Sequence, residues 1–126
     1  MLNTPPVFAV YVAMLTLRWL KAQGGVAAIE TINDQKAALL YSTLESIPFI
    51  NLPVATADRS KMNVVFTMDD PEKEALFMKM CKESGMYGVK GHRSVGGFRI
   101  SLYNALQMES VEAMVALLRD FSQKIG

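Results

Sequence analysis

The feature that most constrains this chain is an almost wholly apolar run from Val7 to Leu20, which only Thr16 and Arg18 interrupt. A membrane-spanning helix needs roughly 20 apolar residues, whereas this run is broken by Arg18 and closed by Lys21. A signal peptide carries positive charge before its apolar run, and the residues before this one have no charged side chain. A helix that is apolar around most of its circumference is usually buried on more than one side. We therefore expect its own fold or a partner chain to cover this helix, and we expect no membrane partner.

Length and composition limit the chain to one ordinary domain with a single core. It has 126 residues, of which 51% are hydrophobic and 20% charged, and its formal net charge of +1 gives no bulk reason to expect a nucleic-acid partner.

The single cysteine, Cys81, excludes an internal disulfide and favours a reducing compartment, so we expect a cytoplasmic protein. One cysteine and one histidine, His92, are poor ligands for structural zinc, so we expect no metal and an inert Cys81 in the core.

Apolar spacing and turn residues predict the order α-α-β-α-β-β-α, which is typical of one α+β or α/β domain in which helices cover a short sheet. Asn3 or Thr4 should cap the first helix, and Lys36 should lie off the apolar face of the second. Arg99 should lie on the open face of its strand. The expected elements are helices at about 6–23 and 26–46, a buried strand at 62–67, a helix from 71 that Gly85 ends, strands at 87–90 and 98–103, and a last helix capped by Ser110.

The strongest local asymmetry is a basic stretch without acids. No Asp or Glu occurs from residue 84 to 108, while Lys90, His92, Arg93 and Arg99 lie close together among glycines. Neighbouring guanidinium groups repel one another, an anion relieves that repulsion, and glycines let the backbone approach the anion. The stretch therefore suggests capture of phosphate or carboxylate. The alternative, that these arginines lie on a solvated sheet face or pair with distant carboxylates, is equally open at this point.

Catalysis by this chain has little support from its residues. No nucleophile motif accompanies His92, so we predict no catalytic residue. A second anion site at the start of the first helix, beside Asn3 and Thr4, remains an alternative to simple capping.

Four blocks in order span nearly the whole chain: NTPP at 3–6, WLKAQGG at 19–25, RSKMNV at 59–64 and KGHRSVGGFRISLYNA at 90–105. Together they resemble the C-terminal part of phosphoserine aminotransferases, and the last block is the most specific. The resemblance implies a fold-type I enzyme that depends on pyridoxal 5'-phosphate and works as a homodimer. Such an enzyme converts 3-phosphohydroxypyruvate and glutamate to phosphoserine and 2-oxoglutarate in serine biosynthesis, and in many bacteria it also serves pyridoxine biosynthesis.

Roles for individual residues also follow from this resemblance. It implies that His92 and Arg93 bind the phosphate of the substrate and that Arg99 binds its carboxylate. It further implies that Asn3 and Thr4 reach the phosphate of the cofactor in the neighbouring subunit of the dimer. A planar guanidinium suits a carboxylate, and a histidine beside an arginine suits a phosphate, so the chemistry agrees.

The main departure from the family is that its Schiff-base lysine, its cofactor-pairing aspartate and its stacking aromatic residue would all lie upstream of Met1. Lys90 belongs to the substrate-side block and does not replace that lysine. We therefore expect residues 1–25 to be a helix that links to an absent large domain, and residues 26–126 to be the small C-terminal aminotransferase domain. Alone, the chain should be inactive and bind no cofactor. The alternative is a non-catalytic domain that binds a phosphorylated metabolite or only folds and oligomerises.

Overall fold

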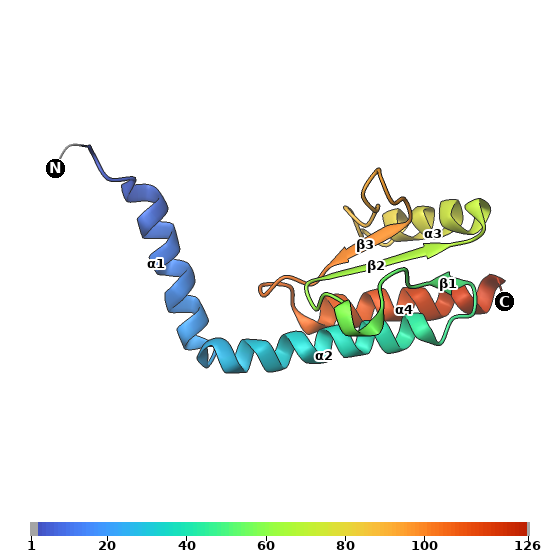
Figure 1. Cartoon of the computed structure of the whole chain (residues 1–126), viewed down its shortest axis with the longest axis horizontal. Coiled ribbons are helices and arrows are strands. Elements are labelled where there is room, and N and C mark those ends of the chain that lie inside the picture. The colour runs from blue at the N-terminus through green and yellow to red at the C-terminus, as the bar shows by residue number, and fades with distance from the viewer. Residues whose placement is uncertain (1–2, 126) are drawn as a thin grey trace. The chain divides into compact units, whose positions relative to one another are not determined.

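The computed structural model describes residues 3–125, and the chain divides into two compact units, Met1–Ile32 and Asn33–Gly126. The combination of helices with a short antiparallel sheet confirms the predicted fold class. In chain order the elements are α1 (Val7–Ala22), α2 (Gly25–Glu45), β1 (Ile50–Asn51), the short 3-10 helix η1 (Thr56–Asp58), β2 (Asn63–Met68), α3 (Pro71–Glu83), β3 (Phe98–Ser101) and α4 (Met108–Ile125) (Figure 1).

In the first unit, α1 begins without a side-chain cap. Its N-cap residue is Pro6 and no side chain bonds to its first turn, so the prediction that Asn3 or Thr4 caps this helix is wrong. The ring of Pro6 fixes φ near the helical value, and this presets the first turn without a cap. At the other end, Gly24 and Gly25 have φ of +95° and +80°, so the helix ends where the sequence predicts.

The apolar side chains of α1 are exposed. None of the residues in this helix is buried, and Phe8 and Leu17 keep 80% and 64% of their surface accessible. Across residues 3–125, no helix combines the length and the apolar character that crossing a bilayer would require. The expectation that another surface covers α1 therefore stays a prediction.

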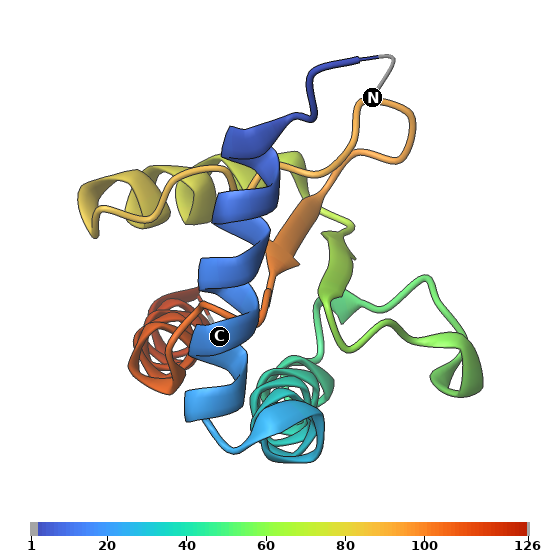
Figure 2. The same ribbon diagram turned by 90° about the vertical axis from the view of Figure 1, so that its left-hand side faces the viewer.

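The second unit is built on a three-stranded antiparallel sheet in the order β1-β2-β3, with Val64 paired to Ile100 and Val65 to Arg99. Helices α3 and α4 lie on the same face of this sheet (Figures 1 and 2). Because side chains alternate across a strand, Phe98 and Ile100 are buried on the helical side and Arg99 is exposed on the other. This arrangement confirms the predicted alternation in β3.

Phenylalanines join the sheet to the helices in the centre of the core. Phe66 of β2 stacks on Phe98 of β3, and Phe77 of α3 meets Phe98 edge to face, with ring centroids 5.0 Å apart in both pairs. Phe121 of α4 lies 5.0 Å from Phe77. Such pairs add about 0.5–1.5 kcal/mol beyond the burial of their area. The predicted apolar stripe of α4 is buried as expected, with Val111, Met114, Val115, Leu118 and Phe121 as its members.

The segment after α3 differs from the prediction. Gly85 ends the helix as expected, with φ of +73°, but residues 87–90 form no strand and make only one bridge, between Lys90 and Phe98. Gly88 has φ of +74°, which turns the chain out of an extended conformation just where a strand would continue. The segment still runs beside β3.

The start of α4 is also earlier than predicted. The helix begins at Met108, so Ser110 lies within its first turn and is not its cap. The N–H of Ser110 donates to the carbonyl of Gln107 at 3.2 Å, which shows that the chain has already turned into the helix. The connection between α2 and β2 contains β1 and η1, neither of which is among the elements expected from the sequence.

One buried lysine holds the segment after β3 against α2. Lys36, predicted to lie off the apolar face, is instead fully buried. Its ammonium donates to the carbonyls of Leu102, Tyr103 and Leu106 at 3.3, 3.0 and 3.1 Å. No described carboxylate pairs with it, and burial lowers the pKa of Lys36 because the charged form loses its water. Backbone carbonyls therefore replace solvent around this charge.

Replacing Lys36 with methionine should lower the free energy of unfolding by about 2–4 kcal/mol, because each buried carbonyl left unpaired costs about 1–3 kcal/mol. Urea denaturation followed by circular dichroism measures this change. Lys82 of α3 is exposed, so a Lys82→Met variant is the matched control and should change stability by less than about 0.5 kcal/mol. Equal effects of the two substitutions would contradict the structural role of Lys36.

The same variant tests the pKa of Lys36. Because this pKa is lower in the folded chain than its ordinary value of 10.5, the unfolded chain binds more protons between the two values. Stability that depends on this group must then rise with pH across that interval. The free energy of unfolding of the original chain minus that of Lys36→Met should therefore increase as the pH approaches 10.5. Urea titrations at several pH values measure the difference, and a decrease would contradict the lowered pKa.

Candidate functional site

A glycine-rich loop, residues 91–97, leads into β3 and is closed at its base. The N–H of Gly91 donates to the carbonyl of Gly97 at 2.8 Å. A side chain on Gly91 would collide with the carbonyl oxygen of Gly96, so only glycine fits there. Gly97 has φ of +59°, and a Cβ on it would lie 2.5 Å from the carbonyl oxygen of Phe66. The base of the loop is thus fixed by backbone contacts that exclude larger residues.

The tip of the loop is a tight turn that begins at His92. The carbonyl of His92 accepts the N–H of Val95 at 2.9 Å and that of Gly96 at 2.8 Å, so Arg93 and Ser94 are the central residues of the turn. The ring Nδ1 of His92 lies 2.7 Å from Ser94 Oγ. Both His92 and Arg93 are exposed at this tip.

Arg99 lies immediately beyond the loop, as the second residue of β3. Its N–H donates to the carbonyl of Val89 at 2.8 Å, and its side chain is exposed on the open face of the sheet. In residues 3–125, neither Arg93 nor Arg99 forms an ion pair, so no distant carboxylate neutralises them. One continuous segment thus brings His92, Arg93 and Arg99 to the start of β3 with two unpaired guanidinium groups. An anion is the species that such a cluster can bind.

A pocket of about 300 Å³ lies beside β3, and Arg99 is among the residues that line it. Its walls come from the segment Gly85–Val89, from β3 and from the start of α4, and its polar side chains include Ser101 and Ser110. Sequence reasoning did not find this pocket because its walls are distant from one another in the chain. The glycines at 85 and 88, which turn the segment beside β3, are the signal that could have indicated it.

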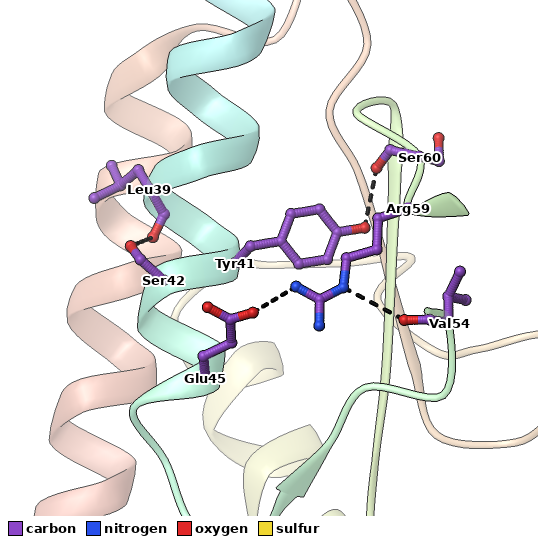
Figure 3. Close-up of polar contacts among 7 residues, drawn as sticks. All are labelled: Leu39, Tyr41, Ser42, Glu45, Val54, Arg59 and Ser60. Carbon is purple, nitrogen blue, oxygen red and sulfur yellow. Dashed lines mark hydrogen bonds and ion pairs between the residues drawn. The ribbon is translucent and has the colours of Figure 1, made fainter. Parts of the chain in front are cut away.

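A separate group of polar contacts fixes the connection before β2 to α2 (Figure 3). Arg59 Nη1 donates to Glu45 Oε1 at 2.5 Å, and its guanidinium carbon lies 5.0 Å from the centroid of the Tyr41 ring. The Tyr41 hydroxyl donates to the carbonyl of Ser60 at 3.0 Å, and Arg59 Nε donates to that of Val54 at 3.4 Å. Burial raises the pKa of Tyr41, while the charge of Arg59 opposes that shift. This arginine is already paired and has a structural role.

The other candidate residues lie elsewhere. Asn3 and Thr4 belong to the first unit, where both are exposed. Cys81 is fully buried in the core, as predicted, and burial raises the pKa of its thiol to about 11, so it remains protonated near neutral pH. The residues that the structure describes contain no group of three or more side chains suited to hold a metal ion.

Comparison with known proteins adds independent evidence. The sequence model of the aminotransferase class-V family matches residues 1–114. The phosphoserine aminotransferase of Flavobacterium johnsoniae is 47% identical over 99% of this chain, and that of Marinomonas sp. is 48% identical over 100%. The chain spans 35% of the length of each of these two relatives. The resemblance found in the four sequence blocks is therefore confirmed.

Solved structures agree with the sequences. The chain is similar to phosphoserine aminotransferase from Bacillus circulans subsp. alkalophilus, with a TM-score of 0.93 and 38% identity over 98% of this chain and 35% of that one. It is also similar to PLP-bound phosphoserine aminotransferase from Trichomonas vaginalis, with a TM-score of 0.85 and 38% identity over 94% of this chain and 34% of that one. Since the family match covers most of the sequence and the fold agrees over nearly all of it, the chain belongs to the aminotransferase class-V family.

Proposed function

We propose that this chain is the C-terminal domain of a phosphoserine aminotransferase and that its second unit binds the anionic ends of the substrate. The reaction is the interconversion of 3-phosphohydroxypyruvate and glutamate with phosphoserine and 2-oxoglutarate in serine biosynthesis, and in many bacteria such enzymes also serve pyridoxine biosynthesis. The observation that carries this proposal is the pair of exposed guanidinium groups, on Arg93 and Arg99, that lack a carboxylate partner among residues 3–125.

Each end of the substrate has its own group of donors. We assign the phosphate to His92 and Arg93 in the turn, and the carboxylate to Arg99 on β3. A guanidinium binds either anion through two parallel N–H donors. The backbone contacts at the base of the loop support this assignment, because a preformed loop loses little freedom when a ligand binds. Holding both ends of the substrate orients the keto or amino carbon between them.

The residues present fit the phosphate of pyridoxal 5'-phosphate and not its reactive end. The bound cofactor supplies the electron sink for amino transfer in such enzymes. Asn3 and Thr4 are exposed and can donate N–H and O–H groups to a phosphate, and we assign them to the cofactor of the partner subunit in a homodimer. Lys36 is the one buried lysine in the described range, and its ammonium already donates hydrogen bonds to three backbone carbonyls. No lysine here is therefore assigned to carry the cofactor.

The rest of the enzyme must then come from a preceding large domain. We assign residues 1–25 to the helix that links to it and residues 26–126 to the small C-terminal domain. The exposed apolar surface of α1 and the relatives' greater length support this assignment. The single, buried Cys81 favours a cytoplasmic location.

Binding measurements test the assignment of the two arginines. By calorimetry, the chain should bind phosphoserine saturably, and Arg93→Gln should weaken phosphoserine and inorganic phosphate about 10- to 100-fold, because charge-assisted hydrogen bonds are lost. Arg99→Gln should weaken phosphoserine and glutamate by similar factors and spare inorganic phosphate. Arg119 of α4 is exposed and forms no ion pair within the described residues, so Arg119→Gln is the matched control.

Two results would contradict this assignment. Equal losses of phosphoserine and glutamate binding in Arg93→Gln would show that the two anionic ends are not held separately. Absence of saturable phosphoserine binding by the unsubstituted chain would favour a domain that only folds and oligomerises.

An activity measurement tests the absence of a lysine that carries the cofactor. With added pyridoxal 5'-phosphate, glutamate and 3-phosphohydroxypyruvate, the chain should form 2-oxoglutarate no faster than the cofactor does without protein. The reason is that no lysine among residues 3–125 is placed to carry the cofactor. The complete phosphoserine aminotransferase of Marinomonas sp. is the positive control. Turnover by the chain above the protein-free rate would contradict the proposal.

A further inference from the structure

His92 is the only histidine of the chain, and Ser94 contacts its ring twice. Ser94 Oγ lies 2.7 Å from His92 Nδ1, and the backbone N–H of Ser94 donates to the same nitrogen at 3.3 Å. A backbone N–H can only donate, so Nδ1 must be the acceptor, and the hydroxyl of Ser94 then donates to it as well. A neutral imidazole has one N–H, which must in that case be on Nε2.

We propose that Ser94 is a positioning residue that holds His92 in the tautomer with its proton on Nε2, so that the ring offers an N–H donor to the phosphate of the substrate. The identity of that ligand rests on the proposed function. The tautomer itself requires no ligand, because both contacts come from within the loop.

The loop fixes both the backbone and the ring of His92. The carbonyl of His92 accepts two backbone N–H groups, from Val95 and Gly96, and this fixes the backbone from which the ring projects. Ser94 then fixes the orientation of the ring relative to that backbone. The tip therefore presents a preformed donor and not a ring that must reorient when the ligand arrives.

The donor character of the tip determines which ligands it accepts. With the proton on Nε2, His92 presents N–H, and the guanidinium of Arg93 also presents only N–H groups. A fully ionised phosphate has only acceptor oxygens, so every contact at the tip can be a hydrogen bond. The hydroxyl of free serine carries no charge and offers fewer acceptor atoms than a phosphate. The tip should therefore favour phosphoserine over serine.

Nuclear magnetic resonance reads the tautomer directly because the chain has a single imidazole. We would record long-range proton–nitrogen correlations on the nitrogen-15-labelled chain without ligand, at about pH 9, where an imidazole is neutral. Nε2 should be protonated and Nδ1 unprotonated, with no averaging between the two forms. In Ser94→Ala only the longer backbone contact to Nδ1 remains, so the ring should begin to sample both tautomers and the two nitrogen signals should move toward each other. Ser94→Thr, which keeps the hydroxyl, should restore the original spectrum. Ser42, an exposed serine of α2, provides Ser42→Ala as a control with an unchanged spectrum.

Two spectra would overturn the proposal. One is a proton on Nδ1, or averaged signals, in the unsubstituted chain. The other is a Ser94→Ala spectrum that matches the original, since the hydroxyl would then have no influence on the tautomer.

Phosphoserine binding tests the donor role of Nε2. A glutamine amide nitrogen can occupy the place of Nε2 and an asparagine amide nitrogen that of Nδ1. His92→Asn should therefore lose at least about 10-fold more affinity than His92→Gln, which corresponds to the loss of one charge-assisted hydrogen bond. An equal or larger loss in His92→Gln would overturn the donor role. If the unsubstituted chain binds no phosphoserine, the proposed function and the donor role both fail, while the ligand-free spectrum still decides the tautomer.

Discussion

The ammonium of Lys36, held by three backbone carbonyls, is the contact on which the geometry of the second unit depends. The first of these carbonyls belongs to Leu102, three residues after Arg99, so the contact fixes where β3 ends. One turn earlier on α2, Asn33 Nδ2 donates to Asn104 Oδ1 at 2.8 Å and strengthens the same connection. An ammonium that donates hydrogen bonds to three carbonyls can fix a segment that has no regular secondary structure, because it replaces the hydrogen bonds that a strand or helix would supply. The position of the arginine on β3 thus depends on a lysine far from it in sequence.

A second constraint is steric and acts on the loop before β3. Gly91 meets the backbone of Gly96, and Gly97 meets the backbone of β2, so the loop closes through contacts that admit no side chain. The chain must then turn within the few residues between, and the carbonyl of His92 collects the N–H groups of that turn. Close backbone packing therefore replaces a hydrophobic core in this part of the molecule. It presents polar side chains in a fixed arrangement on the surface, which is what binding an anion requires.

Local patterns predicted the elements whose packing is local in origin. The apolar stripe of α4, the alternation that exposes Arg99 and the stop at Gly85 each depend on a few neighbouring residues, and each is found in the structure. Lys36 was misplaced because its partners are carbonyls of a distant segment, and the pattern of α2 contains no sign of them. Ser110 was misplaced because a serine favours a cap only if the preceding turn is not already helical. The pocket beside β3 could not be predicted, since it exists only once separate segments are brought together.

A comparison of Arg59, which has a carboxylate partner, with Arg93 and Arg99, which have none among the described residues, shows why the acid-free stretch matters for binding. Arg59 lies near Glu45, and the pair is satisfied within the fold, with Tyr41 beneath the guanidinium. Arg93 and Arg99 lie in a stretch from which Asp and Glu are absent, and the described residues offer them no such partner. A carboxylate placed beside either group would neutralise it and compete directly with a ligand anion. The absence of acids between residues 84 and 108 is therefore a condition for affinity, whereas Arg59, which has a carboxylate within reach, stabilises the fold.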